Sequence, residues 1–439
     1  MGLMRDYVLE LGARVLWPRT RTVLTEKYLS DLDAGDLSLQ PGASDRAILL
    51  DDGTFTGKDP FCRTERSPYV VQLADCTLYP AHTIRLASRG PEASRGGSPG
   101  RKAADRFVRK PGNLIVTRDG GITCGSLSRD GTLPPIVRPA PGAGAWEADL
   151  PKAVDQIDEP VVFIDLICGQ FGHALVDTPS RLWYRLEPSL ELLRGLPVVG
   201  FGTHGIGLHL GRRKPSGWPS YLRLVLAALG VEPEKVRVVT APTRCRSVFI
   251  PKRLSPYWGK YGYSHRYLDA MQAAGDALAR SSEARTTPRR VYLSRSKLDR
   301  ASRRLMDGQE LQIEEIFRQH GFEIVHPQML SLPEQIRTVR DADHVAGCVG
   351  SQMHLLAFAR CEGKRVLRIA PSFFDTPIDR IMVESGGGEY SEFVVERDAK
   401  AGTKPSETPW RLTEEDLTRL RRQVGGWVDG ATGPAMGPD

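Results

Sequence analysis

A histidine and an aspartate stand four residues apart in the stretch 171–177, FGHALVD, as His173 and Asp177. The stretch follows the apolar run 160–166, which is typical of a strand buried on both faces, and opens a helix expected over 172–185. Residues four apart share one face of a helix. A carboxylate there could deprotonate a hydroxyl with His173 as its partner, or His173 could itself be the base. The same spacing also fits a histidine bonded to backbone and an aspartate in a surface ion pair.

A second candidate site combines glycine, serine and arginine. Residues 347–351, GCVGS, predict a strand, a tight turn and the start of a helix at Gly350 and Ser351. The free N–H groups at such a start form a ready site for a diphosphate. Arg295 follows the strand predicted over 290–294 in the same half of the chain and would bring a guanidinium to the same sheet edge. Tight turns also use glycine for steric reasons alone, so only the combination predicts a phosphorylated ligand.

Two further motifs have the spacing of known ligand-binding motifs, but the residues around them do not fit such a site. The glycines of 200–205 have dinucleotide spacing, but no helix begins inside the motif and no acidic residue follows at about 20 residues. The pairs Asp31/Asp33 and Asp341/Asp343 have a spacing that can hold a divalent cation on a diphosphate. The second pair precedes a predicted strand and the first lies in a poorly patterned region, so both are better interpreted as solvated turn aspartates. The sequence predicts no metal and no nicotinamide or flavin cofactor.

The composition is that of a globular protein. Of 439 residues, 40% are hydrophobic and 26% are charged, which excludes a wholly disordered, fibrous or polytopic membrane chain. The 60 basic and 53 acidic residues give a net charge of +7, and arginine predominates among the bases. This excess suits a phosphorylated ligand, an anionic polymer or an anionic membrane face, and codon bias explains it as well. The arginine-rich stretch 95–109 lacks interleaved aromatic residues, so we expect no nucleic-acid partner.

The cysteines and the apolar runs of the sequence indicate the cellular compartment in which the protein is expected. The seven cysteines form no CxxC pair, which indicates neither a zinc knuckle nor a disulfide framework. No run approaches the roughly 18 apolar residues of a membrane-spanning helix. We therefore expect a cytoplasmic protein. Residues 1–17 are interpreted as a solvated first helix or as a weak amphipathic helix in peripheral contact with the inner membrane.

The pattern divides the chain into four parts and predicts an α/β fold. Residues 1–150 show short alternating runs typical of strands and form a β-rich N-terminal region, with a disordered loop expected near 88–106. Strands alternate with helices over 151–288 and again over 289–385. This alternation predicts two Rossmann-like lobes, each with a ligand edge at the carboxyl ends of its strands. Residues 386–439 are expected to form a linker and a C-terminal helix.

An ordered series of motifs over about half of the chain resembles glycosyltransferase family 61. The motifs are, in order, GHALVD at 172–177, PSRL at 179–182, VYLSRSKL at 291–298, RRLMDGQEL at 303–311, GFEIVHP at 321–327, LSLPEQI at 330–336, ADHVAG at 342–347 and the turn Gly350-Ser351. The order of these matches is more specific than any single motif.

The resemblance implies a GT-B-like architecture of two facing Rossmann-like lobes. It implies inverting transfer of a hexosyl or pentosyl group from a nucleotide sugar, without a metal, to a polysaccharide or lipid-linked glycan of the capsular or exopolysaccharide kind. The acceptor lobe would be 151–288 and the nucleotide-sugar lobe 289–385, with the C-terminal helix packed back toward the first. The residues carried over are, on the acceptor side, His173 and Asp177, and, for the donor, Arg295, Arg304, Gly350, Ser351, His354 and Arg368.

Three positions depart from the family pattern. Val349 stands where the family usually has histidine, His354 where it has asparagine, and Arg368 where it has a carboxylate. An arginine in place of a carboxylate removes an acceptor suited to a ribose and adds a donor suited to a phosphate. These departures leave a second hypothesis open, a non-catalytic member that binds sugar nucleotide or glycan within a polysaccharide synthesis complex.

Overall fold

The structure is a computed structural model that describes residues 145–203, 217–254, 264–282, 288–299, 305, 308–374, 376–398 and 408–429. Earlier in the chain it describes the segments 19–26, 33–34, 46–49, 68–80, 114–118, 121–122 and 138–139. The loop predicted near 88–106, the helix predicted over 1–17, the last glycine of the 200–205 motif and Arg304 lie outside these residues.

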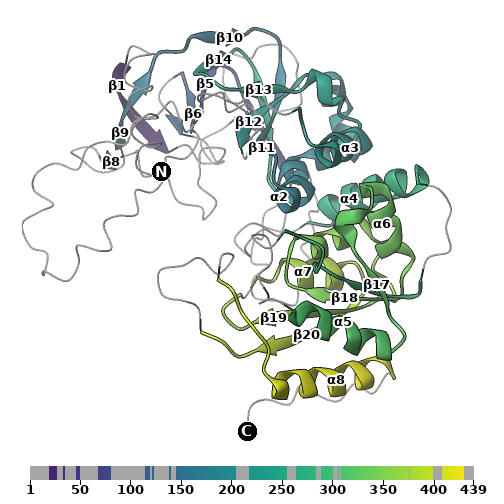
Figure 1. Cartoon of the computed structure of the whole chain (residues 1–439). Coiled ribbons are helices and arrows are strands. Elements are labelled where there is room, and N and C mark those ends of the chain that lie inside the picture. Colours follow the sequence, from purple (N-terminus) through teal and green to yellow (C-terminus); the bar gives the residue numbers. More distant parts are fainter. Residues whose placement is uncertain are drawn as a thin grey trace, which may run out of the picture.

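The described residues form a mixed α/β protein with three sheets (Figure 1). The first sheet has eight strands in the order β10-β14-β5-β6-β7-β1-β9-β8. These strands are β1 (Arg19–Glu26), β5 (Cys76–Tyr79), β6 (Leu114–Thr117), β7 (Gly121–Ile122), β8 (Arg138–Pro139), β9 (Ala145–Pro151), β10 (Asp155–Ile157) and β14 (Thr243–Cys245).

The second sheet has seven strands in the order β13-β12-β11-β15-β4-β3-β2. Its strands β13, β12, β11 and β15 are parallel, and β4 pairs antiparallel with both β15 and β3. The strands are β2 (Asp33–Ala34), β3 (Arg46–Leu49), β4 (Tyr69–Leu73), β11 (Val161–Cys168), β12 (Val198–Thr203), β13 (Arg237–Val239) and β15 (Val248–Pro251). The described strands of residues 1–150 therefore join the sheets of the next segment.

Strand β11 is buried on both faces, as its apolar run predicts. Val161 and Phe163 pack in one core cluster with residues of the first sheet, while Val162 and Ile164 pack in another with the helices. One face of the second sheet is thus covered by a sheet and the other by helices. The covering helices are α2 (Phe171–Val176), α3 (Ser220–Ala228) and the 3₁₀-helices η7 (Thr178–Leu186), η8 (Pro188–Gly195) and η9 (Pro233–Lys235). We call the second sheet with these helices the first lobe.

The helix expected over 172–185 is split in two. Helix α2 ends at Val176, and the 3₁₀-helix η7 begins at Thr178 with Pro179 near its start. Proline has no N–H to donate to the preceding turn and its ring crowds the carbonyl four residues back, so the α-helical ladder stops before it. Asp177 lies at the junction of the two helices.

The third sheet is wholly parallel, with five strands in the order β17-β16-β18-β19-β20. They are β16 (Arg290–Leu293), β17 (Glu323–Val325), β18 (His344–Cys348), β19 (Arg365–Pro371) and β20 (Glu389–Val395). Its helices are α5 (Gln309–Gln319), α6 (Leu332–Asp341), α7 (Ile378–Ser385), α8 (Glu414–Val428) and the 3₁₀-helices η12 (Pro327–Met329) and η13 (Ser351–Phe358). We call this sheet with these helices the second lobe. The capping box predicted at Ser331 and Glu334 is present at the start of α6.

Helix α4 (His265–Arg280) packs on elements of both lobes (Figure 1). Toward the first lobe, Tyr267 Oη donates to Val176 O at 3.2 Å. Toward the second, Gly275 lies so close to the carbonyl of Phe358 that no side chain fits between them. One core cluster contains buried residues from both lobes and from α4. The two lobes therefore share part of their hydrophobic core.

The C-terminal helix corrects one expectation, because α8 packs on the second lobe and not on the first. Its apolar positions Leu417, Leu420, Val424 and Trp427 belong to the core cluster of the second lobe. The Trp427 ring stacks on Phe322 with centroids 5.8 Å apart. In Figure 1, α8 lies beside α5 and β20.

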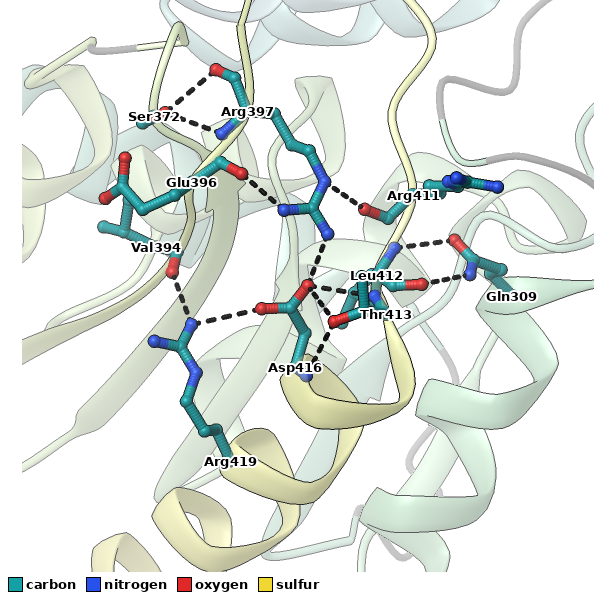
Figure 2. A network of polar contacts seen from close by, with 10 residues as sticks. All are labelled: Gln309, Ser372, Val394, Glu396, Arg397, Arg411, Leu412, Thr413, Asp416 and Arg419. Atoms are coloured by element: carbon teal, nitrogen blue, oxygen red, sulfur yellow. Dashed lines mark hydrogen bonds and ion pairs between the residues drawn. The ribbon is translucent and has the colours of Figure 1, made fainter.

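Polar contacts at the start of α8 hold it in place (Figure 2). Gln309 and the backbone of Leu412 exchange two hydrogen bonds of 2.7 and 2.8 Å. Thr413 and Asp416 form a capping box, and Arg397 donates to the Asp416 carboxylate. Within the capping box, Thr413 Oγ1 accepts from the Asp416 N–H, one of the groups that a helix start leaves without an intrahelical partner.

Candidate functional site

His173 and Asp177 form a hydrogen-bonded pair after the carboxyl end of β11. His173 Nδ1 contacts Asp177 Oδ2, and the exposed fractions of their side chains are 19% and 3%. The aspartate is therefore enclosed, while the histidine retains an accessible edge. The carboxylate lies on Nδ1, so Nε2 is the ring nitrogen on the other side of the imidazole from Asp177. The structure brings these two predicted residues together, and their catalytic role stays a prediction.

A buried ionic network lies behind this pair. Arg253, which follows β15, contacts Asp165 Oδ2 and lies 4.0 Å from Asp177 Oδ1. Arg181 of η7 lies 3.5 Å from the same Asp165 oxygen and donates to Pro251 O. Asp165 has φ +73°, the only positive φ among the described non-glycine residues. Aspartate is among the residue types that tolerate this conformation, because its short side chain bonds locally.

Sequence reasoning missed the roles of Asp165 and Arg253. The one available signal was the break that Asp165 makes in the apolar run of β11. Asp165 and Arg253 are 88 residues apart, so no local spacing relates them. Their pairing follows from the sheet, because β11 and β15 are parallel neighbours whose carboxyl ends meet at one edge.

In the second lobe, Arg295 lies against the glycine turn. Its Nη1 donates to Val349 O at 3.0 Å, and a Cβ added to Gly350 would overlap the same guanidinium. Partial burial lowers the pKa of Arg295, an effect that the nearby Glu310 opposes. The structure thus places Arg295 and Gly350 together, at the ends of the neighbouring strands β16 and β18.

Glu310 stabilises the position of Arg295 next to the glycine turn. Its Oε1 accepts hydrogen bonds from Tyr292 Oη at 2.8 Å and from the Arg295 backbone N–H at 3.2 Å. Burial raises the pKa of the Glu310 carboxyl, while the bonds from Tyr292 and Arg295 act in the opposite direction. Cys348 Sγ lies 3.3 Å from Tyr292 Oη, and burial raises the pKa of its thiol well above the ordinary value. The buried thiol is therefore not a candidate nucleophile.

The two candidate sites meet where α2 and η13 pack together. A Cβ added to Gly172 would lie 2.6 Å from Ser351 Oγ and 3.2 Å from His354 Cδ2. Only a residue without a side chain permits this approach. The Gly172-His173 start of α2 and the Gly350-Ser351 start of η13 are therefore neighbours across the lobes.

His354 and Arg368 are linked by a residue that the sequence analysis did not single out. His354 Nδ1 lies 3.1 Å from Asp379 Oδ1, and Arg368 Nη1 lies 3.4 Å from Asp379 Oδ2. Arg368 also donates to Glu392 and to the Thr376 carbonyl. Its side chain is 2% exposed. The structure thus places Arg368 among internal acceptors, and its predicted contact with the donor stays untested.

Other sequence features lie away from this junction. Asp343 pairs with Arg289, and Asp341 pairs with Arg337, at the amino end of β18 and far along the strand from Gly350. In the described part of the chain, no group of three or more histidine, cysteine or acidic side chains is placed to hold a metal ion. No helix of the described ranges is long and apolar enough to cross a bilayer.

Comparisons with known proteins test the family resemblance that the sequence motifs indicate. A search of curated proteins finds no match. Among solved structures, 21 chains match, and one is the dodecameric iron-containing heptosyltransferase TibC in complex with ADP-D-β-D-heptose. It is 12% identical over 91% of this chain and 97% of its own, with a TM-score of 0.29. Residues 171–367, which include both candidate sites, match the family model described as Glycosyltransferase 61. This match supports a glycosyltransferase of family 61.

Proposed function

We propose that this chain is an inverting glycosyltransferase that uses no metal and moves a sugar from a nucleotide-sugar donor to a polysaccharide or lipid-linked glycan. We place the acceptor on the first lobe and the donor on the second, in a GT-B-like arrangement. The family match supports the reaction class. Capsular or exopolysaccharide synthesis, a hexosyl or pentosyl donor, and a cytoplasmic location with peripheral membrane contact belong to the same proposal.

One observation carries the proposal, namely the position of both sites in their sheets. In the first lobe the chain passes from β11 to β12 on one side and later to β15 on the other. In the second lobe it passes from β16 to β17 on one side and to β18 on the other. Ligands of open parallel sheets bind outside the carboxyl ends of the strands at such reversal points. His173 follows the first reversal point, Arg295 and Gly350 follow the second, and Gly172 contacts Ser351 between them.

On the acceptor side, His173 is assigned as the general base. Its Nε2 accepts the proton of the acceptor hydroxyl as the hydroxyl oxygen attacks the anomeric carbon. Asp177 orients the ring through Nδ1 and stabilises the imidazolium that forms, and Arg253 lies 4.0 Å from the other oxygen of the aspartate. Attack from the face opposite the leaving group inverts the configuration at this carbon.

On the donor side, the bond between the anomeric carbon and the diphosphate oxygen breaks, and the diphosphate leaves with the electron pair. Arg295 and the N–H groups at Gly350 and Ser351 are assigned to the negative charge that develops there. Arg295 is held before the ligand arrives, since its Nη1 donates to Val349 O. Fixed donors of this kind need no reorganisation during the reaction.

The test is turnover with a panel of UDP-, GDP-, ADP- and dTDP-linked sugars, measured as release of the nucleoside diphosphate. We expect release with at least one donor and a fall in kcat of about 10²- to 10⁴-fold in His173→Ala and Asp177→Asn, since each loses the proton acceptor or its orientation. Asp416→Asn, at the distant start of α8, serves as the matched control and should keep the wild-type kcat. Binding of a donor without turnover would favour the non-catalytic hypothesis. Neither binding nor turnover across the panel would contradict the proposal.

A further inference from the structure

Strand β11 departs from regular β structure at Asp165. Its pairing with β12 shifts register between Phe163 and Leu166, so a β-bulge interrupts the ladder there. Within the bulge, Asp165 has a φ of +73°, a left-handed conformation that costs free energy in any residue with a side chain. Bulges re-aim a side chain and are over-represented next to active sites. The strained conformation in a central strand therefore indicates a role for the Asp165 side chain.

Gly200 of β12 makes room for this bulge. Two residues of β11, Ile164 and Asp165, lie opposite this single glycine. A Cβ added to Gly200 would lie 2.8 Å from Asp165 O and 3.0 Å from two carbon atoms of the Ile167 side chain. Real Cβ atoms do not approach a backbone oxygen this closely, so β12 needs a glycine here. The first glycine of the 200–205 motif thus serves the conformation of Asp165.

The Asp165 carboxylate joins two arginines from different elements. Its Oδ2 accepts a hydrogen bond from Arg253 Nη2 and lies 3.5 Å from Arg181 Nη2. Arg253 follows β15, and Arg181 belongs to η7. Arg181 Nη1 also donates to Pro251 O at the end of β15. The re-aimed carboxylate therefore lies between η7 and the segment that follows β15.

The two arginines connect Asp165 to the candidate base pair. Arg253 Nη1 lies 4.0 Å from Asp177 Oδ1, whereas the other oxygen of Asp177 contacts His173. Arg181 follows Asp177 by four residues, in the 3₁₀-helix that begins directly after it. The four charged side chains of this network are at most 16% exposed, so water screens their interactions little. A change at Asp165 can therefore reach Asp177 through both arginines.

We propose that Asp165 is a positioning residue for the His173–Asp177 pair. Its carboxylate holds Arg181 and Arg253, and these two guanidiniums fix the position of Asp177, from which the imidazole of His173 takes its orientation. This inference rests on the proposed function, since it takes His173 as the base on the acceptor side. Asp165 acts through other residues, and it matters to the rate because a small displacement of a proton acceptor slows the chemical step.

The first test compares Asp165→Asn with the wild-type chain, on the nucleotide sugar that the wild-type chain turns over. Asparagine keeps the shape of the side chain and tolerates a positive φ, so the variant removes the charge and retains the bulge. We expect kcat to fall about 10- to 100-fold, as for a misplaced catalytic group. The affinity for the nucleoside diphosphate should keep its wild-type value, because the proposed donor site lies on the second lobe.

A double variant shows whether Asp165 acts through Asp177. Adding Asp165→Asn to Asp177→Asn should not lower kcat further, because the orientation of the ring is already lost. Asp276→Asn is the matched control, since its carboxylate is also shared by two arginines, Arg340 at 2.7 Å and Arg360 at 3.0 Å. Its side chain is 21% exposed against 16% for Asp165. This control should lower the midpoint of chemical denaturation and keep the wild-type kcat.

Gly200→Ala perturbs the bulge without removing a charge. The added Cβ must displace the Asp165 backbone, so kcat should fall while the affinity for the nucleoside diphosphate stays unchanged. Gly195→Ala is the control, because a Cβ there meets no atom within 4 Å. A further measurement needs no ligand, namely the ¹⁵N shift of His173 Nδ1, observed through the carbon-bound ring protons and identified by its absence in His173→Ala. Asp165→Asn should change this shift in the same direction as Asp177→Asn.

The outcomes separate the two proposals. A wild-type kcat in Asp165→Asn, an equal fall of kcat with and without Asp177→Asn, or an unchanged Nδ1 shift would each overturn the positioning role. The glycosyltransferase proposal would stand in all three cases. If the wild-type chain turns over none of the nucleotide sugars, the proposed function is overturned together with this inference.

Discussion

At the scale of single residues, the proposed base His173 lies beside a network of charges that are removed from water. Asp165 and Asp177 carry two negative charges, and Arg181 and Arg253 carry two positive ones. The four side chains are between 3% and 16% exposed. Arg253 is the member that contacts both aspartates. A buried charge left without its partner costs far more than an exposed one, so this arginine should be the most sensitive position of the network.

We expect Arg253→Met to lower the free energy of unfolding by about 3–5 kcal/mol, because it leaves Asp165 and Asp177 with one arginine fewer in a buried setting. Chemical denaturation measures the change. Arg237→Met is the control, since its ion pair with Glu159 is about half exposed and should contribute about 0–1 kcal/mol. Adding Asp165→Asn to Arg253→Met should recover part of the loss by removing the unpaired charge. Equal losses in Arg253→Met and Arg237→Met would refute this account of the network.

At the scale of elements, the approach of α2 to η13 depends on the missing side chain of Gly172. An alanine there would bring its Cβ within 3.0 Å of Ser351 Cβ as well as 2.6 Å from its Oγ. Real Cβ atoms do not make such contacts, so one of the two helix starts must move. Ser351 would be displaced from the position that we propose for binding the donor diphosphate.

Gly172→Ala should therefore cost about 0.5–3 kcal/mol of stability and reduce turnover together with nucleotide affinity. Gly195→Ala is the matched control, because a Cβ at Gly195 meets no atom within 4 Å. Ser351→Ala in the Gly172→Ala background removes the closest atom and should restore part of the affinity. The idea fails if Gly172→Ala and Gly195→Ala behave alike in thermal melting and in nucleotide binding.

The start of α8 gives a second prediction at this scale. Burial opposes the charge of Asp416, but hydrogen bonds from Thr413 and the guanidinium of Arg397 outweigh it and lower the pKa of the carboxyl (Figure 2). A carboxyl with a lowered pKa stabilises the folded state fully above its unfolded pKa of about 3.9, and the contribution fades as the pH falls through the folded value. Asp416→Asn should cost about 1 kcal/mol at neutral pH, which is typical of a lost helix cap.

Denaturation of the wild-type chain and of Asp416→Asn should thus give curves that differ at pH 7 and converge below about pH 4. Thr413→Ala removes the hydroxyl that bonds both the N–H and the carboxylate of Asp416, and should give a loss of similar size. A difference that persists unchanged into acid would show that the charge of Asp416 is not what stabilises the helix start.

At the scale of the whole molecule, local signals in the sequence predicted most individual elements of the third sheet and of the parallel part of the second. The apolar run of β11, the capping box at Ser331 and the glycine turn at Gly350 all lie where their patterns predict. Helix α7 and strand β20 were not expected, because β20 is an edge strand that is mostly half-exposed and lacks a continuous apolar run. The alternation of strands and helices also carried no information on how β4 and β5 join distant strands.

The candidate site was predictable only where its residues lie close in sequence. His173 with Asp177 and Gly350 with Ser351 are local pairs, and their spacing is sufficient to relate them. Asp379 approaches His354 from a separate helix that lies 25 residues further on, through a bond that no spacing rule encodes. Contacts of this kind depend on how helices pack over the sheet, which is set by side chains distributed along the whole chain.

The position of α4 limits where two related chains can be joined to make a chimera. A junction after Ser282 would pair α4 from one parent with the second lobe of another, where Gly275 must fit under the Phe358 carbonyl and Asp276 must meet Arg340 and Arg360. A junction before Ser264 would move α4 with the second lobe and leave its contacts to η7 and to Val176 unmatched. A folded chimera of the two lobes therefore has to carry one of these two surfaces along with the helix, so α4 limits where the chain can be exchanged.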